Sequence, residues 1–391
     1  MTDFSTLLAG LPPRQGFGDA TLIRLEPGSI DLGGGNPDTA LLPVDVYRDA
    51  FDAVVTDATF PSLLRYSPAP GLPALRAAIA EREGVDVDRI LVTNGGAHGL
   101  ALAVLSLLDP GDTIVVDDPV YPLFLRVLDL VPGVKVVPLA AGPDGVDLEA
   151  LAGVLAGGIR PTALFTVPTF QNPSGGTLSD EKAAALVALA EQHGFTIIAD
   201  DPYREIAFPG FTTPAHRAFR DTDRVLAVNS FSKTLGPGLR LGWLVVPAGT
   251  SERITRLRNR LDGQTSGVLQ AVVERMLRDD RLAPSIAAAG AGYAAKAGAL
   301  LSALDEEFGD RVSVAAPGGG FFVWAQLHGD VDTERLFDDA QTLGVTYQRG
   351  EWFAAGGADH RGRVRLSYSE PDEASLREGV ARLARAYRAL A

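Results

Sequence analysis

NSFSKTLGPGLRLGW, residues 229–243, completes the apolar run RVLAVNS and contains one lysine, Lys233. The chain has only three other lysines, Lys135, Lys182 and Lys296, against 31 arginines. Lys182 and Lys296 lie on ordinary helical patterns, and Lys135 lies on an edge-like strand. Lys233 is therefore the one lysine of the four that directly follows the buried type of apolar run, and its role is the question that this stretch raises.

Composition and charge exclude several classes of protein. The length of 391 residues allows two or three domains, and 46% hydrophobic residues without a low-complexity tract are typical of a compact globular chain. The net charge of −14 argues against a nucleic-acid partner, because phosphate backbones bind clustered cations. The absence of cysteine excludes disulfides, thiolate metal sites and cysteine nucleophiles.

The remaining sequence-wide signals point to no metal and no membrane. The five histidines are scattered without metal-ligand spacing, so we expect no metal site. The N-terminus lacks a basic region followed by an apolar run, and no segment is long enough to span a bilayer. We expect a cytoplasmic protein.

Between about residues 70 and 250, helical patterns alternate with short apolar runs. Such alternation indicates crossover units and a mostly parallel sheet covered on both faces, hence an α/β fold. The expected helices are 73–83, 99–108 and 180–193, the last started by Ser179. The expected strands are 90–93, 112–118, 163–168, 195–200 and 224–230.

After residue 250 the pattern changes to long helices, followed by mixed helices and strands. This order suggests a smaller α+β domain. The expected elements are helices at 252–261, 294–308, 333–344 and from 371, and strands at 321–327 and 363–369. We place a large domain at 46–285, and a small domain at 1–45 together with 286–391.

Polar residues follow five of the expected strands, at 94–98, 119–121, 169–175, 200–203 and 230–240. In an open parallel sheet, ligands bind at the carboxyl ends of the strands. The set combines small residues ahead of a helix, which suit phosphate, with an aromatic ring, a carboxylate, an amide, a phenol and one lysine. This inventory matches pyridoxal phosphate, a flat, phosphorylated, cationic heterocycle that carries an aldehyde.

Seven motifs in order carry a resemblance to a known family. The chain resembles the fold type I pyridoxal-phosphate enzymes, specifically the class I/II aminotransferases of the aminoadipate and kynurenine aminotransferase branch, whose relatives form the C-terminal domain of MocR-type regulators. The resemblance covers about residue 30 to the end and implies a large domain with a mostly parallel seven-stranded sheet plus a smaller α+β domain. The motifs are Tyr66-x4-Gly71, the loop after ILVT, Pro119-Val120-Tyr121, Asn172-Pro173-Ser174-Gly175, Asp200-x2-Tyr203, Ser230-x-Ser232-Lys233-x6-Arg240 and Arg365-Leu366-Ser367-Tyr368.

The resemblance implies a role for each residue around the cofactor ring. Lys233 would bind the cofactor aldehyde and move the substrate proton, and Asp200 would pair with the pyridine nitrogen. Asn172 and Tyr203 would bond the phenolic oxygen, and Tyr121 would stack on the ring. The simpler interpretations are a surface lysine, an ordinary Asn-Pro turn, a core Tyr203 and a Tyr121 that packs at the start of a helix.

The resemblance also implies a phosphate site and a homodimer. Tyr66 would reach the phosphate from a second subunit, so the two active sites would be shared. The residues expected on the phosphate side within one subunit are Gly96 and Ala97, through their backbone, Ser230, Ser232 and Arg240.

For the substrate, Arg365 in Arg-Leu-Ser-Tyr would grip the α-carboxylate, with Asn172 beside it. Gly34 and Gly35 resemble a glycine turn that closes over the substrate, although an ordinary loop explains them equally well.

A second arginine for an acidic side chain is left open among Arg14, Arg24 and Arg349. Two segments depart from the family pattern, residues 95–98 where relatives have Gly-Ser-Gln-Gln, and residues 349–352 where relatives have Pro-Gly.

The expected reaction is ping-pong transfer of an amino group between an α-amino acid and a 2-keto acid. A lyase or an oxidative decarboxylating deaminase on the same scaffold is the alternative, because the cofactor supports all of these reactions. A sensor without turnover is a third possibility. No winged-helix segment precedes the catalytic part, which argues against a DNA-binding regulator.

Overall fold

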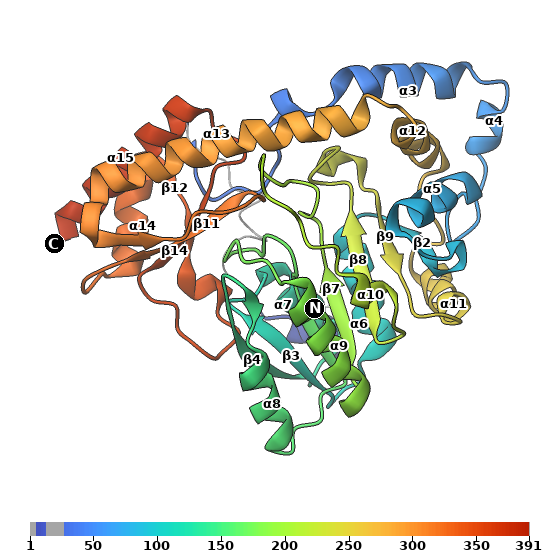
Figure 1. The fold of residues 1–391 in the computed structure, drawn as a ribbon, viewed down its shortest axis with the longest axis horizontal. Helices are drawn as coiled ribbons and strands as arrows, with labels where there is room; N and C mark the ends of the chain where they lie inside the picture. The colour runs from blue at the N-terminus through green and yellow to red at the C-terminus, as the bar shows by residue number, and fades with distance from the viewer. Residues whose placement is uncertain (1–4, 13–26, 391) are drawn as a thin grey trace.

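The computed structural model describes residues 5–12 and 27–390. A sheet of eight strands lies at the centre of one part of the molecule, in the order β2-β9-β8-β7-β6-β3-β4-β5 (Figure 1). The pairs β3·β4, β3·β6, β6·β7 and β7·β8 are parallel, whereas β9 runs antiparallel to both β8 and β2. The strands are β2 (Ile90–Thr93), β3 (Thr113–Asp118), β4 (Lys135–Gly142), β5 (Gly145–Val146), β6 (Ala163–Thr166), β7 (Thr196–Asp200), β8 (Val225–Ser230) and β9 (Gly242–Val245).

The expectation of a mostly parallel seven-stranded sheet is confirmed, and the two-residue β5 extends its edge as an antiparallel eighth strand. Two strands in this sheet lacked a sequence prediction, β5 and β9. β9 follows the turn around Arg240 after only a few residues, and its four residues are too short to show a period.

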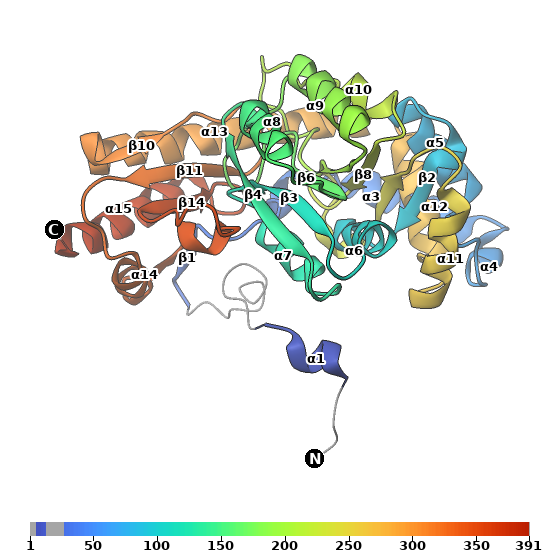
Figure 2. The ribbon, with the colours of Figure 1, turned by 90° about the horizontal axis from the view of Figure 1, so that it is seen from below.

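Both faces of this sheet are covered by helices, which explains the continuous apolar strands. Figure 2 shows α8, α9 and α10 on one side of the sheet and α6 and α7 on the other. Along β3, Ile114 and Val116 pack with the α6 and α7 side, whereas Val115 packs with the α8 and α9 side. The alternation is the ordinary period of a strand.

The helices of this part begin close to the predicted positions. α9 begins after Ser179, whose hydroxyl accepts the Lys182 N–H at 3.2 Å, as expected. α6 begins at Gly96, earlier than predicted. The helices are α3 (Val44–Thr56), α4 (Phe60–Leu63), α5 (Pro73–Glu83), α6 (Gly96–Leu107), α7 (Pro122–Leu128), α8 (Leu148–Ala156), α9 (Asp180–His193), α10 (Arg217–Arg220), α11 (Ser251–Leu261) and α12 (Gly267–Leu277), and a separate short helix, α1 (Thr6–Gly10), lies near the N-terminus.

The second part is built on a four-stranded antiparallel sheet in the order β10-β11-β14-β13. A two-stranded parallel sheet, β1 with β12, ties the N-terminal segment to it. Its elements are α13 (Leu282–Phe308), β10 (Val312–Val314), β11 (Phe322–Leu327), α14 (Thr333–Thr342), β12 (Val345–Thr346), β13 (Gln348–Arg349), β14 (Arg363–Ser367), α15 (Glu373–Leu390) and β1 (Ile30–Asp31).

α13 is the link between the two parts, since its 27 residues run from the side of α12 to that of α15 (Figure 1). The domain limits 46–285, and 1–45 with 286–391, remain our proposal. The limit at residue 285 falls inside the first turn of α13.

Among the described residues, no helix is both long and apolar enough to cross a membrane. The cytoplasmic location stays a prediction.

The cap of α9 gives a stability prediction. Replacing Ser179 with Ala removes the acceptor for the Lys182 N–H, so the free energy of unfolding should fall by about 1 kcal/mol, measured as a lower urea midpoint. Ser179→Asp, which also caps, is the matched control and should keep the midpoint. Equal midpoints for the Ala variant and the parent would contradict the assigned role of the cap.

Candidate active site

Lys233 lies just beyond the end of β8 and is half-buried. Its Nζ donates a hydrogen bond to the Gly35 carbonyl at 2.7 Å and lies 5.6 Å from the centre of the Tyr203 ring. Burial lowers the pKa of Lys233 to about 8, and the Arg365 and Arg240 charges add to this, whereas Asp200 opposes it. About a tenth of the amine is therefore unprotonated, and nucleophilic, at pH 7, far more than for an ordinary lysine.

Asp200 ends β7 and is buried. Burial raises the pKa of its carboxyl to about 7, the neighbouring Asp201 adds to this, and Lys233 lowers it. No helix begins at the neighbouring Asp201. Its backbone N–H instead donates to the Val228 carbonyl at 2.9 Å, which ties the segment after β7 to β8.

The expected ring-binding residues gather around these two groups. Asn172 follows β6, and its Oδ1 accepts a hydrogen bond from Arg365 Nη1 at 2.9 Å. Tyr203 is buried, which raises the pKa of its phenol, while a hydrogen bond with Asn172 lowers it. Tyr121 precedes α7. Burial raises the pKa of its phenol, the Asp200 charge also raises it, and the Arg365 charge lowers it.

The N-terminus of α6 forms a cradle with β8 and Arg240. Gly95 precedes the helix with φ +82°, and a Cβ placed on it would lie 2.8 Å from Arg240 Nη2. A Cβ on Gly96 would lie 3.6 Å from the Ser230 Cβ, and the Ser230 and Ser232 hydroxyls are 2.7 Å apart. The first N–H groups of a helix lack intrahelical partners, so free donors, hydroxyls and a guanidinium meet here.

His98 belongs to the segment 95–98 that departs from the family pattern, and its ring holds the loop that leads into α6. His98 Nδ1 accepts the Asn94 N–H at 3.0 Å, so in the neutral ring Nε2 carries the proton. That nitrogen lies 3.7 Å from Asp262 Oδ1. Burial lowers the pKa of His98, Asp262 raises it and Arg258 lowers it. His98 therefore connects the loop to the end of α11.

Arg365 lies on β14 and is fully buried. Its Nη2 donates to the Gly33 carbonyl, and its guanidinium carbon lies 4.1 Å from the centre of the Phe322 ring and 5.3 Å from that of Phe353. Burial lowers its pKa to about 10, and Tyr203 among others raises it. The guanidinium still carries its charge at neutral pH.

The glycine turn of Gly34 and Gly35 contacts the same buried groups. The Gly34 N–H donates to Asp31 Oδ1 at 2.9 Å, and the Gly35 carbonyl accepts from Lys233. These contacts place the turn beside both Lys233 and Arg365, the latter through Gly33. The turn is thus part of the same cluster.

Tyr66 lies outside this buried cluster, since its side chain is fully exposed. Of the arginines considered for an acidic substrate group, Arg14 and Arg24 lie outside the described residues. Arg349 Nε is 3.6 Å from Glu351 Oε2, and its guanidinium carbon is 5.8 Å from the centre of the Trp352 ring.

The strand register separates Arg349 from Arg365. Gln348 pairs with Arg365 across β13 and β14, and successive residues of a strand point to opposite faces. Gln348 therefore shares the face of Arg365, and its Nε2 lies 3.0 Å from where a Cβ on Gly33 would stand. No signal in the sequence marked Gln348.

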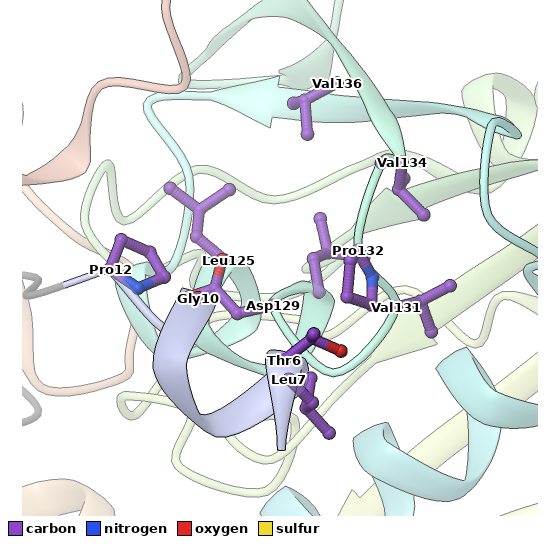
Figure 3. A pocket seen from close by; sticks show the side chains of 12 residues that line it. Thr6, Leu7, Gly10, Pro12, Leu125, Asp129, Val131, Pro132, Val134 and Val136 are labelled. Atoms are coloured by element: carbon purple, nitrogen blue, oxygen red, sulfur yellow. The ribbon is translucent and has the colours of Figure 1, made fainter. Parts of the chain in front are cut away.

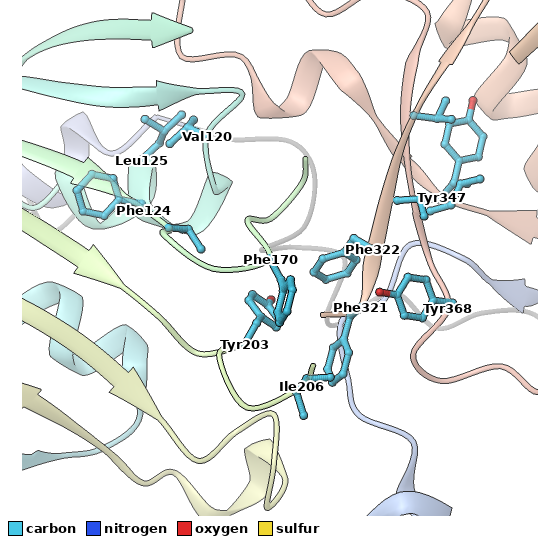
Figure 4. Close-up of a cluster of buried hydrophobic side chains, with 14 of the residues drawn as sticks. Val120, Phe124, Leu125, Phe170, Tyr203, Ile206, Phe321, Phe322, Tyr347 and Tyr368 are labelled. Carbon is cyan, nitrogen blue, oxygen red and sulfur yellow. The ribbon is translucent and has the colours of Figure 1, made fainter. Parts of the chain in front are cut away.

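Aromatic side chains fill the space between the two sheets. Figure 4 shows Phe170 and Tyr203 from the large sheet facing Phe321 and Phe322 from the small one. The centre of the Tyr203 ring lies 5.7 Å from that of Phe321 and 5.8 Å from that of Phe322. This packing excludes water from one side of the Lys233 amine and accounts for its burial.

A separate cavity lies between α1, α7 and the start of β4 (Figure 3). Its volume is about 320 Å³, and valine, leucine and proline side chains line most of it. Because its lining contains none of the residues named above, it is not part of this site.

Comparison with known proteins agrees with this geometry. Residues 27–383 match the family described as aminotransferase class I and II. The chain belongs to this family. It is 32% identical to aromatic-amino-acid aminotransferase 1 of Thermococcus litoralis, over 91% of this chain and 87% of the relative.

One solved structure and one regulator extend the comparison. This chain is similar to the solved structure of LysN, the α-aminoadipate aminotransferase of Thermus thermophilus, in complex with N-(5'-phosphopyridoxyl)-L-leucine. The TM-score is 0.89 and the sequence identity is 30%, and the match covers 99% of this chain and 97% of LysN. The regulator TauR of Rhodobacter capsulatus is 32% identical over 79% of this chain, which spans 63% of the regulator. The resemblance stated from the motifs is confirmed.

The protein is accordingly a pyridoxal-phosphate-dependent aminotransferase of fold type I, which acts on amino and keto acids. The residues present fit the cofactor. A Cβ on Gly95 would run into the Arg240 guanidinium, so glycine leaves the cradle open to a phosphate, and the buried Asp200 carboxyl suits a cationic ring nitrogen.

Several contacts were not foreseen from the sequence. The carbonyls of Gly33 and Gly35 accept from Arg365 and Lys233, and the run of three glycines was the only signal for them. The rings of Phe322 and Phe353 flank Arg365, and this depends on strand register, which no local pattern specifies.

The raised pKa of Asp200 predicts a pH dependence of stability. The folded cofactor-free protein binds a proton at Asp200 up to about pH 7, whereas an unperturbed carboxyl has a pKa of 3.8. The stabilising contribution is complete below about pH 4 and is lost as pH rises to about 7, with a total on the order of 4 kcal/mol. Asp200→Asn should remove this slope in urea unfolding of the cofactor-free protein, and an unchanged slope would contradict the assignment.

Proposed function

We propose that the protein moves an amino group from an α-amino acid to a 2-oxo acid in two half-reactions, with Lys233 as the catalytic amine. The observation that carries the proposal is the burial of Lys233, which lowers the pKa of its amine, at a place where the charges of Arg365 and Asp200 both act on that pKa. A neutral amine at this place can bond the cofactor aldehyde and later accept the α-proton of the substrate.

The other residues divide between cofactor and substrate. When bound, pyridoxal phosphate supplies an electron sink for the carbanion that deprotonation creates. Asp200 would hold the ring nitrogen protonated, Asn172 and Tyr203 would bond the phenolic oxygen, and Tyr121 would cover the ring face. The proposed phosphate ligands are the N–H groups of Gly96 and Ala97, the hydroxyls of Ser230 and Ser232, and Arg240.

Arg365 would bind the α-carboxylate of the substrate. Its guanidinium is buried between two phenyl rings, and such a desolvated donor pair favours a carboxylate over water. Gly34 and Gly35 would close the site on the side of the Lys233 amine, and Asn172 would orient Arg365 through the 2.9 Å hydrogen bond.

The test is the visible spectrum of the cofactor-loaded protein with a panel of amino acids and no oxo acid. We expect one donor class to convert the cofactor to its amine form, and a 2-oxo acid to restore it. Aromatic amino acids and 2-aminoadipate come first in the panel, because relatives carry these names. Ammonia or carbon dioxide release with an unchanged cofactor would overturn the proposal, as would no spectral change with any donor.

Lys233→Ala is the control for the panel. It should lose both the spectral conversion and the borohydride-trapped cofactor, because no other amine replaces it. Lys182→Ala is the matched variant, since Lys182 is held at Asp144, away from the site, and it should keep both. A trapped adduct that persists in Lys233→Ala would disprove the assigned attachment point.

We also propose that the protein is a homodimer in which Tyr66 binds the phosphate of the neighbouring subunit. Its fully exposed phenol suits this role, because the side chain has room to reach another chain. Leu64, two residues earlier, is also strongly exposed.

Subunit mixing tests the shared site. Lys233→Ala and Tyr66→Asp should each be inactive, the second because a carboxylate would repel the phosphate. After unfolding and refolding of an equal mixture, about half of the dimers contain one intact site, so about one quarter of the parent activity should return. Absence of recovery, with dimers present by sedimentation, would place Tyr66 in its own subunit's site, and full activity of Tyr66→Asp alone would place it in none.

A further inference from the structure

Residues 354–362 connect the short helical turn Gly350–Phe353 to β14, and Asp118 at the end of β3 holds this loop from the other sheet. Asp118 Oδ1 accepts the Ala355 N–H at 3.1 Å, and Oδ2 accepts the Ala358 N–H at 2.8 Å. His360 Nε2 lies 2.8 Å from Oδ1, and it is the donor because a carboxylate only accepts. Three donors from one loop thus meet on one buried carboxylate.

The loop is shaped for this contact. A Cβ on Gly357 would lie 2.4 Å from Asp118 Oδ2, so only glycine permits the approach. His360 has φ +52°, a left-handed conformation that costs energy for most residues and is tolerated by His and Asn. Burial alone would raise the pKa of Asp118, but the hydrogen bonds from His360, Ala358 and Ala355 lower it below its usual value.

Aromatic rings connect the contact between Asp118 and His360 to Arg365. The Val120 N–H donates to the Phe353 carbonyl at 2.9 Å, next to Tyr121. The centre of the fully buried Phe353 ring lies 5.3 Å from the Arg365 guanidinium carbon and 5.3 Å from the centre of the Trp324 ring. Trp324 in turn meets the His360 ring edge to face at 5.8 Å.

We infer that Asp118 and His360 are positioning residues that set the place of the Arg365 guanidinium relative to Tyr121. The inference rests on the proposed role of Arg365 as the carboxylate ligand. Tyr121 follows Asp118 by three residues on the large sheet, and Arg365 follows His360 by five on the small sheet. The Asp118–His360 contact therefore fixes the distance across which an amino acid must bind both the cofactor and Arg365.

The test uses the cofactor-loaded protein and the variants His360→Asn and Asp118→Asn. Asn keeps the tolerance for positive φ but is too short to reach Asp118. We expect KM for the amino donor to rise on the order of tenfold with little change in kcat, because carboxylate binding is lost equally in the ground and transition states. His360→Gln, whose amide can donate like Nε2, should restore most of the affinity.

A second readout does not depend on turnover. The dissociation constant of the 2-oxo acid of the best donor, titrated calorimetrically into the aldehyde form of the protein, should rise by the same factor. The affinity for pyridoxal phosphate should stay unchanged. His328→Asn is the matched control, since His328 makes its contacts with Ser313 and Asp310 near β10, and it should leave all three values as in the parent.

The outcomes separate this inference from the proposed function. If Arg365→Lys weakens oxo-acid binding but the Asp118 and His360 variants change only the melting temperature, the contact is purely structural and the inference is wrong. If Arg365→Lys also leaves binding unchanged, the proposed role of Arg365 is wrong. If His360→Asn does not fold, Asp118→Asn tests the same contact from the other side and decides alone.

Discussion

The constraint on which this site depends is the burial of unlike charges where the carboxyl edge of the large sheet meets β14 of the small sheet. Lys233, Asp200 and Arg365 lie close enough for their charges to act on one another, and burial shifts each pKa toward the neutral form, to about 8, 7 and 10. Buried charges are costly unless opposite charges accompany them. A ligand that brings a cationic ring nitrogen, a phosphate and a carboxylate compensates all of them together, which a simpler ligand does not.

The topology explains why these groups meet. β3, β6, β7 and β8 are neighbours and parallel, so Tyr121, Asn172, Asp200 and Lys233 follow four adjacent strands at the same edge. β9 runs the other way, which brings Arg240, just before it, back to the same edge beside Gly95. Arg365 comes from the second sheet, so the substrate side of the site depends on how the two sheets pack.

This difference explains what the sequence predicts well and what it does not. The apolar runs identify the strands of the large sheet, and the polar residues that follow each run identify the groups around the cofactor. This works because each of these residues is close in the chain to the strand that positions it. The partners of Arg365 are 12 to 332 residues away, at Phe353 and Gly33, and they follow from packing of β14 against β11 and β13. Arginines also stand at positions 361 and 363, and in the sequence only the Arg-Leu-Ser-Tyr motif distinguishes Arg365 from them. For the same reason the sequence does not predict the contacts of Asp118 with the loop 354–362 or the position of Gln348 beside Arg365.

The placement of Arg365 also bears on which reaction the scaffold performs. The bond that breaks in pyridoxal-phosphate chemistry is the one that protein groups orient and that a base can reach. A carboxylate gripped by a buried guanidinium is retained rather than released, which disfavours decarboxylation. The Lys233 amine lies near that guanidinium and has a pKa close to neutral, so it suits removal and return of the α-proton.

Elimination would require a different group, an acid beside the substrate side chain that protonates the leaving group. Glu351 is the acid in the segment that departs from the family, but its carboxylate accepts a hydrogen bond from Thr333 and lies beside the guanidinium of Arg349. The Arg349 side chain is on the strand face opposite to Arg365. The arrangement thus favours proton transfer at the α-carbon, which transamination requires.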